Sequence, residues 1–170
     1  MAALHGLNAE EYFAKFRDNL TNNTYAEKLK CLFEGKILYS DSFSQSMCDL
    51  GQEAYEIVWD CESLQKTWAK EHGVPYSRNH WQFEILCAQI EFIRPEVVYF
   101  QGTEAAIPGR FSGDSRNSSL VTLLKERFTF IRLISMFSGF PTSVKRTADV
   151  DILFSCTPTI QNHYKRLGIP

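Results

Sequence analysis

Residues 80–102 read HWQFEILCAQIEFIRPEVVYFQG, and this stretch decides the fold. Its first fifteen residues repeat apolar side chains at helical spacing. Pro95 then ends the helix, because proline lacks the N–H that a helix interior needs. The β-branched and aromatic run 97–100 predicts a short strand that ends at Gln101-Gly102. A helix that leads directly into an apolar strand is typical of a parallel α/β sheet.

The helix predicted over 80–94 has an unusually broad apolar face. One stripe is made of Trp81, Ile85, Ala88 and Phe92, and it is widened by Leu86, Ile90 and Ile93. So broad a face indicates a helix that is pressed against a sheet. We expect Trp81, Ile85 and Phe92 to make that contact.

The same alternation extends in both directions from this stretch. We predict further strands over 54–59, 128–137 and 150–154, and further helices over 8–20, 24–33, 41–50, 62–72, 118–127 and 159–167. Continuously apolar strands that alternate with helices indicate a parallel sheet covered on both faces. The predicted fold is therefore an α/β, Rossmann-like three-layer sandwich with a mostly parallel sheet and extra N-terminal helices, forming a single domain over residues 1–170.

Parallel sheets bind ligands outside the carboxyl ends of their strands, and this rule selects three places in the chain. They are Gln101-Gly102, Ser138-Gly139 and the segment 156–158. The loop 102–117, GTEAAIPGRFSGDSRN, could also close over a ligand through Arg110 or Arg116, or it could be an ordinary surface loop. The candidate cleft-lining residues are Gln101, Gly102, Arg110, Ser138, Gly139 and Thr157.

Several familiar chemistries have no motif in this chain. Neither GxGxxG, nor GxxxxGK[ST], nor GxSxG occurs, and the four histidines lack metal-ligand spacing, so we expect no metal site. The five scattered cysteines predict reduced, mostly buried thiols, of which Cys156 alone is a candidate for ligand contact. Asp149 and Asp151 could act in acid–base chemistry, but a solvated strand end is the favoured interpretation. His80 is interpreted as a helix cap or, less favoured, as a cleft residue.

The composition and charge of the chain limit the kinds of partner that we expect it to bind. The 170 residues are 44% hydrophobic and 22% charged, as in an ordinary globular protein. Net charge is −6 over residues 1–102 and +4 over 103–146, which favours an anionic ligand or a partner surface. A pI of about 6.1 argues against nucleic acid as a partner. No apolar run is long enough for a membrane span and no export signal is visible, so we expect a cytoplasmic protein.

A resemblance adds to this interpretation. Residues 39–73, YSDSFSQSMCDLGQEAYEIVWDCESLQKTWAKEHG, resemble a segment of the CgeB-like (spore-maturation-protein-like) glycosyltransferases of bacteria, which carry an SDxYSxxLxxLGHEA-type stretch, a strand and a PLQxAWAxEHG helix. Residues 81–101 are similar to the W-x-x-x-I-L-x-A-Q-I helix and R-P-D-V-L-Y-x-Q strand of that family. Residues 150–169 are similar to its D-x-[IV]-L-[ST]-[SC]-x-P…RxLGI ending.

The resemblance implies the N-terminal, acceptor-side half of a GT-B glycosyltransferase. Such enzymes move a sugar from a nucleotide-sugar donor to a glycan or metabolite acceptor, and the donor is expected at a second, C-terminal domain that this chain lacks. No cofactor is then bound by this chain, and the isolated chain is expected to be inactive. Family members often open with a strand whose loop supplies catalytic contacts. Residues 1–7 are too few to place that strand, so no catalytic residue is carried over.

Two other functions remain open at this stage. The chain could be a free-standing binding or interaction module that keeps the Rossmann-like fold without the chemistry. A receiver-type signalling domain is disfavoured, because paired acidic residues after the first strand and a lysine after a late strand are not evident. A second α/β domain encoded downstream would favour the enzyme over the module.

Overall fold

The fold was analysed in a computed structural model, which describes residues 1–5, 23–34, 40–103, 105, 118–141 and 149–168. Within these ranges the chain forms one five-stranded sheet, in which every neighbouring pair of strands is parallel. The strands are β1 (Ala2–His5), β2 (Tyr55–Val58), β3 (Val97–Phe100), β4 (Leu133–Phe137) and β5 (Ile152–Phe154), in the spatial order β2-β1-β3-β4-β5. This is the order of doubly wound, flavodoxin-like sheets, whose switch point lies between β1 and β3.

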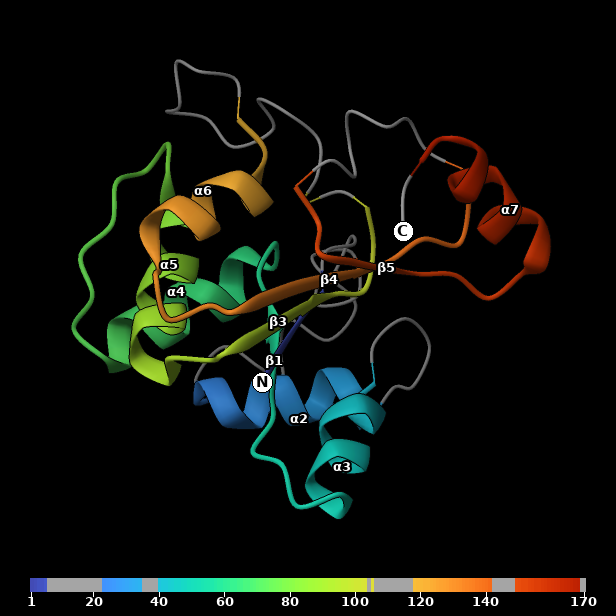
Figure 1. The fold of residues 1–170 in the computed structure, drawn as a ribbon. Coiled ribbons are helices and arrows are strands. Elements are labelled where there is room, and N and C mark those ends of the chain that lie inside the picture. Colours follow the sequence, from blue (N-terminus) through green and yellow to red (C-terminus); the bar gives the residue numbers. More distant parts are fainter. Residues whose placement is uncertain (6–22, 35–39, 104, 106–117, 142–148, 169–170) are drawn as a thin grey trace.

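Helices cover both faces of the sheet. In the described ranges they are α2 (Tyr25–Glu34), α3 (Ser42–Asp49), α4 (Glu62–Glu71), α5 (Trp81–Ile93), α6 (Leu120–Arg127) and α7 (Pro158–Arg166). Figure 1 shows α2 and α3 on one side of the sheet and α5 and α6 on the other. Helix α4 packs against both α2 and α5, so it closes the side of the sheet next to β2. The predicted three-layer α/β sandwich is confirmed.

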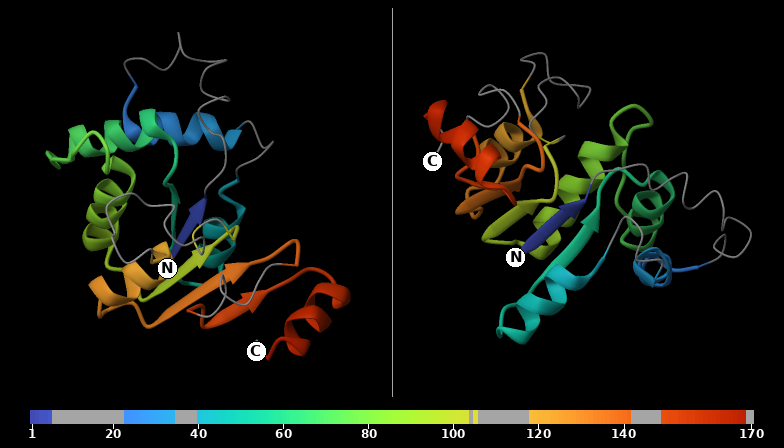
Figure 2. Two further views of the ribbon diagram at one scale, coloured as in Figure 1. Left: turned by 90° about the horizontal axis from the view of Figure 1, so that it is seen from above. Right: turned by 90° about the vertical axis from the view of Figure 1, so that its right-hand side faces the viewer.

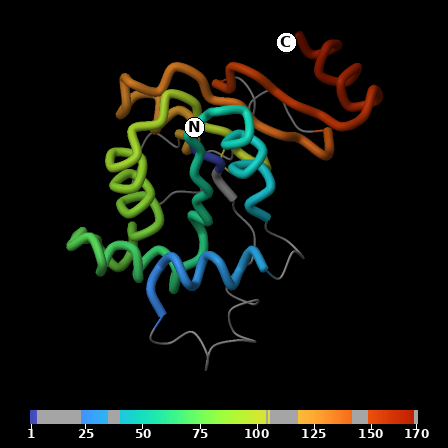
Figure 3. Tube along the Cα trace, turned by 90° about the horizontal axis from the view of Figure 1, so that it is seen from below, coloured from blue at the N-terminus to red at the C-terminus, as the bar shows by residue number. Residues whose placement is uncertain are grey.

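The two edge strands have different surroundings. Helices α2 and α4 lie side by side near edge strand β2, whereas α7 lies at the far end of the sheet beside β5 (Figures 2 and 3). The β5 side is more open: Ile152 and Phe154 are 40% and 50% exposed.

The main core lies between the sheet and helices α5 and α6. It is built from alternate residues of the strands, which share one face because side chains alternate along a strand. Its strand members include Ile57, Phe100 and Met136, and its helix members include Leu86 and Leu124, all at most 1% exposed. The apolar strand residues that defined the fold in the sequence therefore do form the centre of the molecule.

Helix α5 faces the sheet with different residues from those expected. Leu86 and Ile90 contact the sheet core, whereas Ile85 packs with Trp68 and Ala69 of α4. Phe92 is 69% exposed, so the expected contact through Trp81, Ile85 and Phe92 is wrong. The physical reason is that α5 lies between the sheet and α4, so both halves of its broad apolar surface are used.

Other expectations changed at the chain's first strand and at β4. Residues 2–5 form β1, which pairs with both β2 and β3, although the sequence did not allow this strand to be placed. The strand expected over 128–137 begins only at Leu133, because Phe128 ends α6 and is buried in the main core. The helix expected over 8–20 lies outside the described residues.

Candidate functional site

The carboxyl ends of the strands are the first candidate site, because the sequence placed six residues there. The register pairs Phe100 with Met136 and Phe137 with Phe154, so the next residues of β3, β4 and β5 form a row along one edge. In this row Gln101 is exposed and Gly102 is half-buried. Arg110 lies outside the described residues.

Ser138 lies in this row but serves the fold. Its side chain is fully buried, and its hydroxyl donates to the Phe140 carbonyl over 2.6 Å. The same hydroxyl lies 2.6 Å from the Tyr164 hydroxyl of α7. Gly139 is half-buried, and a Cβ atom there would lie 3.5 Å from the Phe137 ring, which is ordinary contact. Ser138 thus joins β4 to α7, and it does not face solvent.

Thr157 also has a structural partner. It is the N-cap of α7, and its hydroxyl accepts a hydrogen bond from the Ile160 backbone N–H over 3.3 Å. Pro158 at the first helical position fits the same start signal. Cys156, beside it, is exposed. Of the described residues predicted for this site, Gln101, Gly102 and Gly139 lie at this edge with at least part of their surface accessible.

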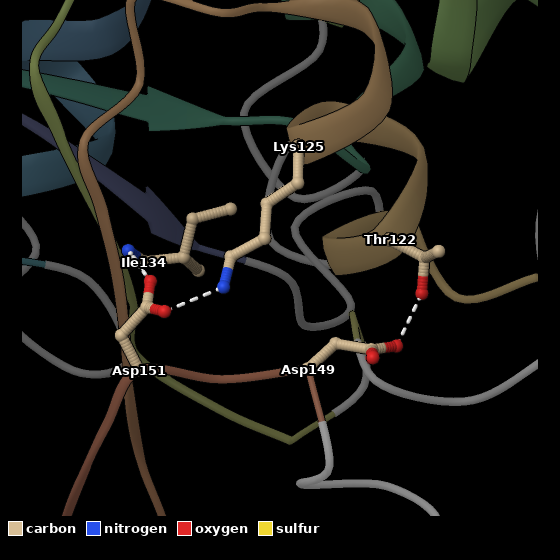
Figure 4. A network of polar contacts seen from close by, with 5 residues as sticks. All are labelled: Thr122, Lys125, Ile134, Asp149 and Asp151. Carbon is tan, nitrogen blue, oxygen red and sulfur yellow. Dashed lines mark hydrogen bonds and ion pairs between the residues drawn. The ribbon is translucent and has the colours of Figure 1, made fainter.

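The acidic pair is used structurally at the opposite end of β5 (Figure 4). Asp149 accepts from the Thr122 hydroxyl, and Asp151 accepts from the Lys125 ammonium over 2.6 Å and from the Ile134 backbone N–H over 2.7 Å. Partial burial disfavours ionisation of Asp151, but these hydrogen bonds and the Lys125 charge outweigh it and lower its pKa. The two carboxylates therefore tie α6 to the sheet and do not form a catalytic dyad.

A second region of the molecule holds a cavity of about 940 Å³ against edge strand β2. Its wall takes residues from β2 and from the four helices α2, α3, α4 and α5. Its charged, polar and aromatic lining residues include Tyr25, Asp41, Glu56, Trp68, Glu71, His72, Gln89 and Phe92. None of the five described residues predicted for the carboxyl edge lines this cavity.

Two carboxylates in the cavity wall cap helices from a distance. Glu56 on β2 is 7% exposed and accepts a 2.8 Å hydrogen bond from the Ser44 N–H in the first turn of α3. This contact explains why Asp41, the N-cap residue of α3, makes no capping hydrogen bond itself. Glu71 of α4 likewise accepts from the Tyr25 N–H at the start of α2 over 2.8 Å. Both helix N-termini are therefore already matched by negative charge.

Aromatic and amide groups complete this wall. The rings of Trp68 and His72 stack at 4.1 Å, and Phe92 meets His72 edge-on at 5.2 Å. Gln89 of α5 is only 1% exposed and hydrogen-bonds the Tyr25 hydroxyl, yet its Oε1 atom has no hydrogen-bond partner in the described structure. Burial raises the pKa of the Tyr25 hydroxyl, so Tyr25 is neutral at physiological pH.

No family model matches the chain, and no curated protein or solved structure is significantly similar to it.

Among the described residues, no three His, Cys, Asp or Glu side chains are grouped so that they could hold a metal ion. Burial raises the pKa of the Cys87 thiol to about 12, so this residue is a core side chain and not a nucleophile. None of the helices in the described ranges has the length and apolar character that crossing a bilayer requires.

Sequence reasoning missed the cavity because its wall is assembled from five separated elements. One local signal was present: Thr24 and Glu27 form a reciprocal capping box, which fixes the start of α2 at the cavity. His80 occupies the N-cap position of α5, as favoured, but its side chain makes no capping hydrogen bond. Nothing in the linear sequence brings Glu56, Glu71 and Gln89 together.

Proposed function

We propose that this chain is the acceptor-side domain of a glycosyltransferase of the GT-B type. The observation that carries the proposal is the all-parallel sheet in the order β2-β1-β3-β4-β5, with its carboxyl ends along one edge. Such an edge is where doubly wound sheets bind ligands, and in a GT-B enzyme it faces the second domain. The resemblance of residues 39–73, 81–101 and 150–169 to CgeB-like glycosyltransferases supports the same assignment.

In this proposal the acceptor lies along the carboxyl edge of the sheet, next to Gln101, Gly102 and Gly139. Gln101 is exposed, and its amide can both donate to and accept from a sugar hydroxyl. Gly102 and Gly139 have no side chain, so the backbone can approach a ligand closely. Ser138 and Thr157 position α7 and have no direct role with the acceptor.

Donor binding is assigned to a second domain. A departing nucleoside diphosphate needs concentrated positive charge or helix N-termini. At the large cavity of this chain the N-termini of α2 and α3 are met by Glu71 and Glu56, which repel phosphate. The isolated chain is therefore expected to bind the acceptor weakly and to transfer no sugar.

The test of this function is a titration of the 170-residue chain with UDP-, GDP- and TDP-sugars by calorimetry, with donor hydrolysis assayed in parallel. The proposal predicts no measurable donor affinity and no sugar release above background. In the same samples, NMR screening with neutral mono- and oligosaccharides should shift the Gly102 and Gly139 amide signals. Gln101→Ala should weaken that response, whereas Gln52→Ala, at an exposed position outside this row, should not. Micromolar donor affinity, or no saccharide response at these amides, would contradict the proposal.

A free-standing binding module is the second candidate, and the cavity against β2 favours it. That cavity is lined by five elements of this chain, so a ligand there would need no other domain. A reading frame that continues into a second α/β domain would favour the glycosyltransferase, and one without it would favour the module.

A further inference from the structure

We propose that the cavity between β2 and helices α2 to α5 binds a small organic cation, that is, a ligand with an ammonium group on a compact body. This site is separate from the carboxyl edge of the sheet, and the inference does not rest on the proposed function. A cavity of about 940 Å³ is within the range of small-molecule sites. Its wall is supplied by five elements that pack against one another.

The charge of the wall selects a cation. Among the described residues, its acidic and basic side chains are the four carboxylates of Glu34, Asp41, Glu56 and Glu71, the ammonium of Lys30, and His72. With His72 neutral this is a formal charge of −3. The N-termini of α2 and α3 offset about half a charge each, so the wall stays negative.

The acids differ in how far their charge is already compensated. Lys30 forms an ion pair with Glu34 at 3.7 Å, so these two largely cancel. Glu71 accepts its hydrogen bond from a backbone N–H, and Asp41 accepts from the neutral Gln45 amide. Within the described residues the donors of these hydrogen bonds are uncharged, so they do not neutralise the negative charge of Glu71 and Asp41. A ligand ammonium supplies that missing charge.

Aromatic rings provide the second feature that a cation recognises. The cavity is lined by Tyr25, Trp68, His72 and Phe92, of which three form the stacked and edge-on cluster on α4 and α5. Aromatic faces attract cations through their quadrupole, and tryptophan does so most strongly. Phe92 is 69% exposed although it is large and apolar, and contact with a ligand body would give this side chain a role.

Gln89 supplies an independent polar contact. It lines the cavity, is 1% exposed, and its Oε1 atom has no hydrogen-bond partner in the described structure. A buried carbonyl oxygen without a donor is costly, and such atoms are rare in native structures. An ammonium N–H or a ligand hydroxyl could satisfy this oxygen once the Gln89 side chain turns toward the cavity, because the atom has almost no accessible surface in this conformation.

Anionic ligands fit this site poorly. The helix N-termini that would attract a phosphate are occupied by the carboxylates of Glu56 and Glu71. A neutral ligand could use the rings and Gln89, but it would leave the negative charge unused. The structure therefore assigns the cavity to a cation, and a matched pair of probes can separate these cases.

The experiment compares choline with its neutral isostere 3,3-dimethylbutan-1-ol, using the 170-residue chain labelled with ¹⁵N. The indole N–H signal of Trp68 reports on the cavity, and that of Trp59, buried in the main core, serves as an internal reference. Choline should shift the Trp68 signal saturably, and the isostere should bind at least about twofold more weakly. Glucosamine against glucose repeats the comparison on a polyol body and shows which body the site prefers.

Variants test whether the wall causes this selectivity. Glu71→Gln keeps an oxygen for the Tyr25 N–H and removes the charge, so it should weaken choline about two- to fivefold and leave the isostere unchanged. Phe92→Ala should weaken both probes. The control Glu62→Gln removes the same charge from α4 outside the cavity and should change neither.

Three outcomes would overturn the proposal. One is an equal response to choline and its isostere together with equal responses to glucosamine and glucose. Another is a Trp68 signal that none of the four probes shifts in the folded protein. The third is an equal loss of choline binding in Glu62→Gln and Glu71→Gln. Donor titrations and saccharide shifts at Gly102 and Gly139 play no part in these measurements. The cation proposal can therefore fail while the glycosyltransferase proposal stands, and the glycosyltransferase proposal can fail while the cation proposal stands.

Discussion

The carboxyl edge of the sheet and the cavity against β2 differ in how their polar side chains are used. At the carboxyl edge, Ser138 is hydrogen-bonded to Phe140 and Tyr164, and Thr157 caps α7. In the cavity, Gln89 keeps an oxygen without a partner, although it is just as deeply buried. Ser138 and Thr157, at the edge where the fold predicts a ligand site, thus serve the fold itself, whereas the Gln89 oxygen is left without a partner. The contrast is between these particular side chains, since the Ser155 hydroxyl at the carboxyl edge is also buried without a partner in the described structure.

Ser138→Ala should produce the largest loss of stability among the changes that test this difference. Its hydroxyl is fully buried between β4 and α7, so its removal should lower the free energy of unfolding by about 1–3 kcal/mol. Urea denaturation measures this change. Ser155→Ala is the matched control, because the Ser155 hydroxyl is buried without a hydrogen-bond partner in the described structure and should be lost without cost. Equal effects of the two changes would show that Ser138 has no special structural role.

Thr157→Ala should have a smaller effect. Removal of a helix N-cap side chain costs about 1 kcal/mol, and here it leaves the Ile160 N–H without its hydrogen bond. Thr159→Ala, at the exposed second position of α7, should stay within about 0.5 kcal/mol of the unchanged protein. If instead Thr157→Ala leaves the free energy of unfolding in urea unchanged and weakens saccharide binding, Thr157 belongs to the acceptor site and has no structural role in α7.

Asp151→Asn should have the smallest of these effects, and it should depend on pH. Asp151 has a pKa below the usual value of about 3.9, so its contribution is present above that value and is lost as pH falls through the folded-state pKa. Because its side chain is 38% exposed, we expect only about 0.5 kcal/mol at neutral pH. Thermal unfolding at pH 7 and near pH 3 should show a difference that becomes smaller in acid. A difference independent of pH would contradict the assigned role of the ion pair with Lys125.

Much of the fold could be predicted from the sequence because its signals are local. The run 97–100, the helix break at Pro95 and the apolar strand residues gave the parallel sheet and most of its helices. Strand β1 was not predicted, since four residues, Ala2–His5, carry too little pattern without their neighbours on both sides. The prediction of which side of α5 faces the sheet was wrong, because the sheet and α4 both pack against its broad apolar surface.

The candidate sites were less accessible to sequence reasoning. The rule for parallel sheets placed Gln101, Gly102 and Gly139 at the correct edge, because strand ends are visible in the sequence. It could not show that Ser138 is buried, since its partner Tyr164 is 26 residues away. The cavity depends on contacts between Tyr25 and Glu71, 46 residues apart, which no local pattern contains.

The most direct test of the division between the two regions is the free energy of unfolding of Gln89→Met. Methionine has a similar length and shape, and it removes the buried oxygen that has no partner. Because it also removes the hydrogen bond to Tyr25, the change is made in a Tyr25→Phe background and compared with Tyr25→Phe alone. If this oxygen is kept for a ligand, its removal should leave stability unchanged or raise it by about 1 kcal/mol in urea denaturation without ligand. A loss of about 1.5 kcal/mol or more, comparable with that of Ser138→Ala, would show that Gln89 serves the fold in the same way and would contradict the division.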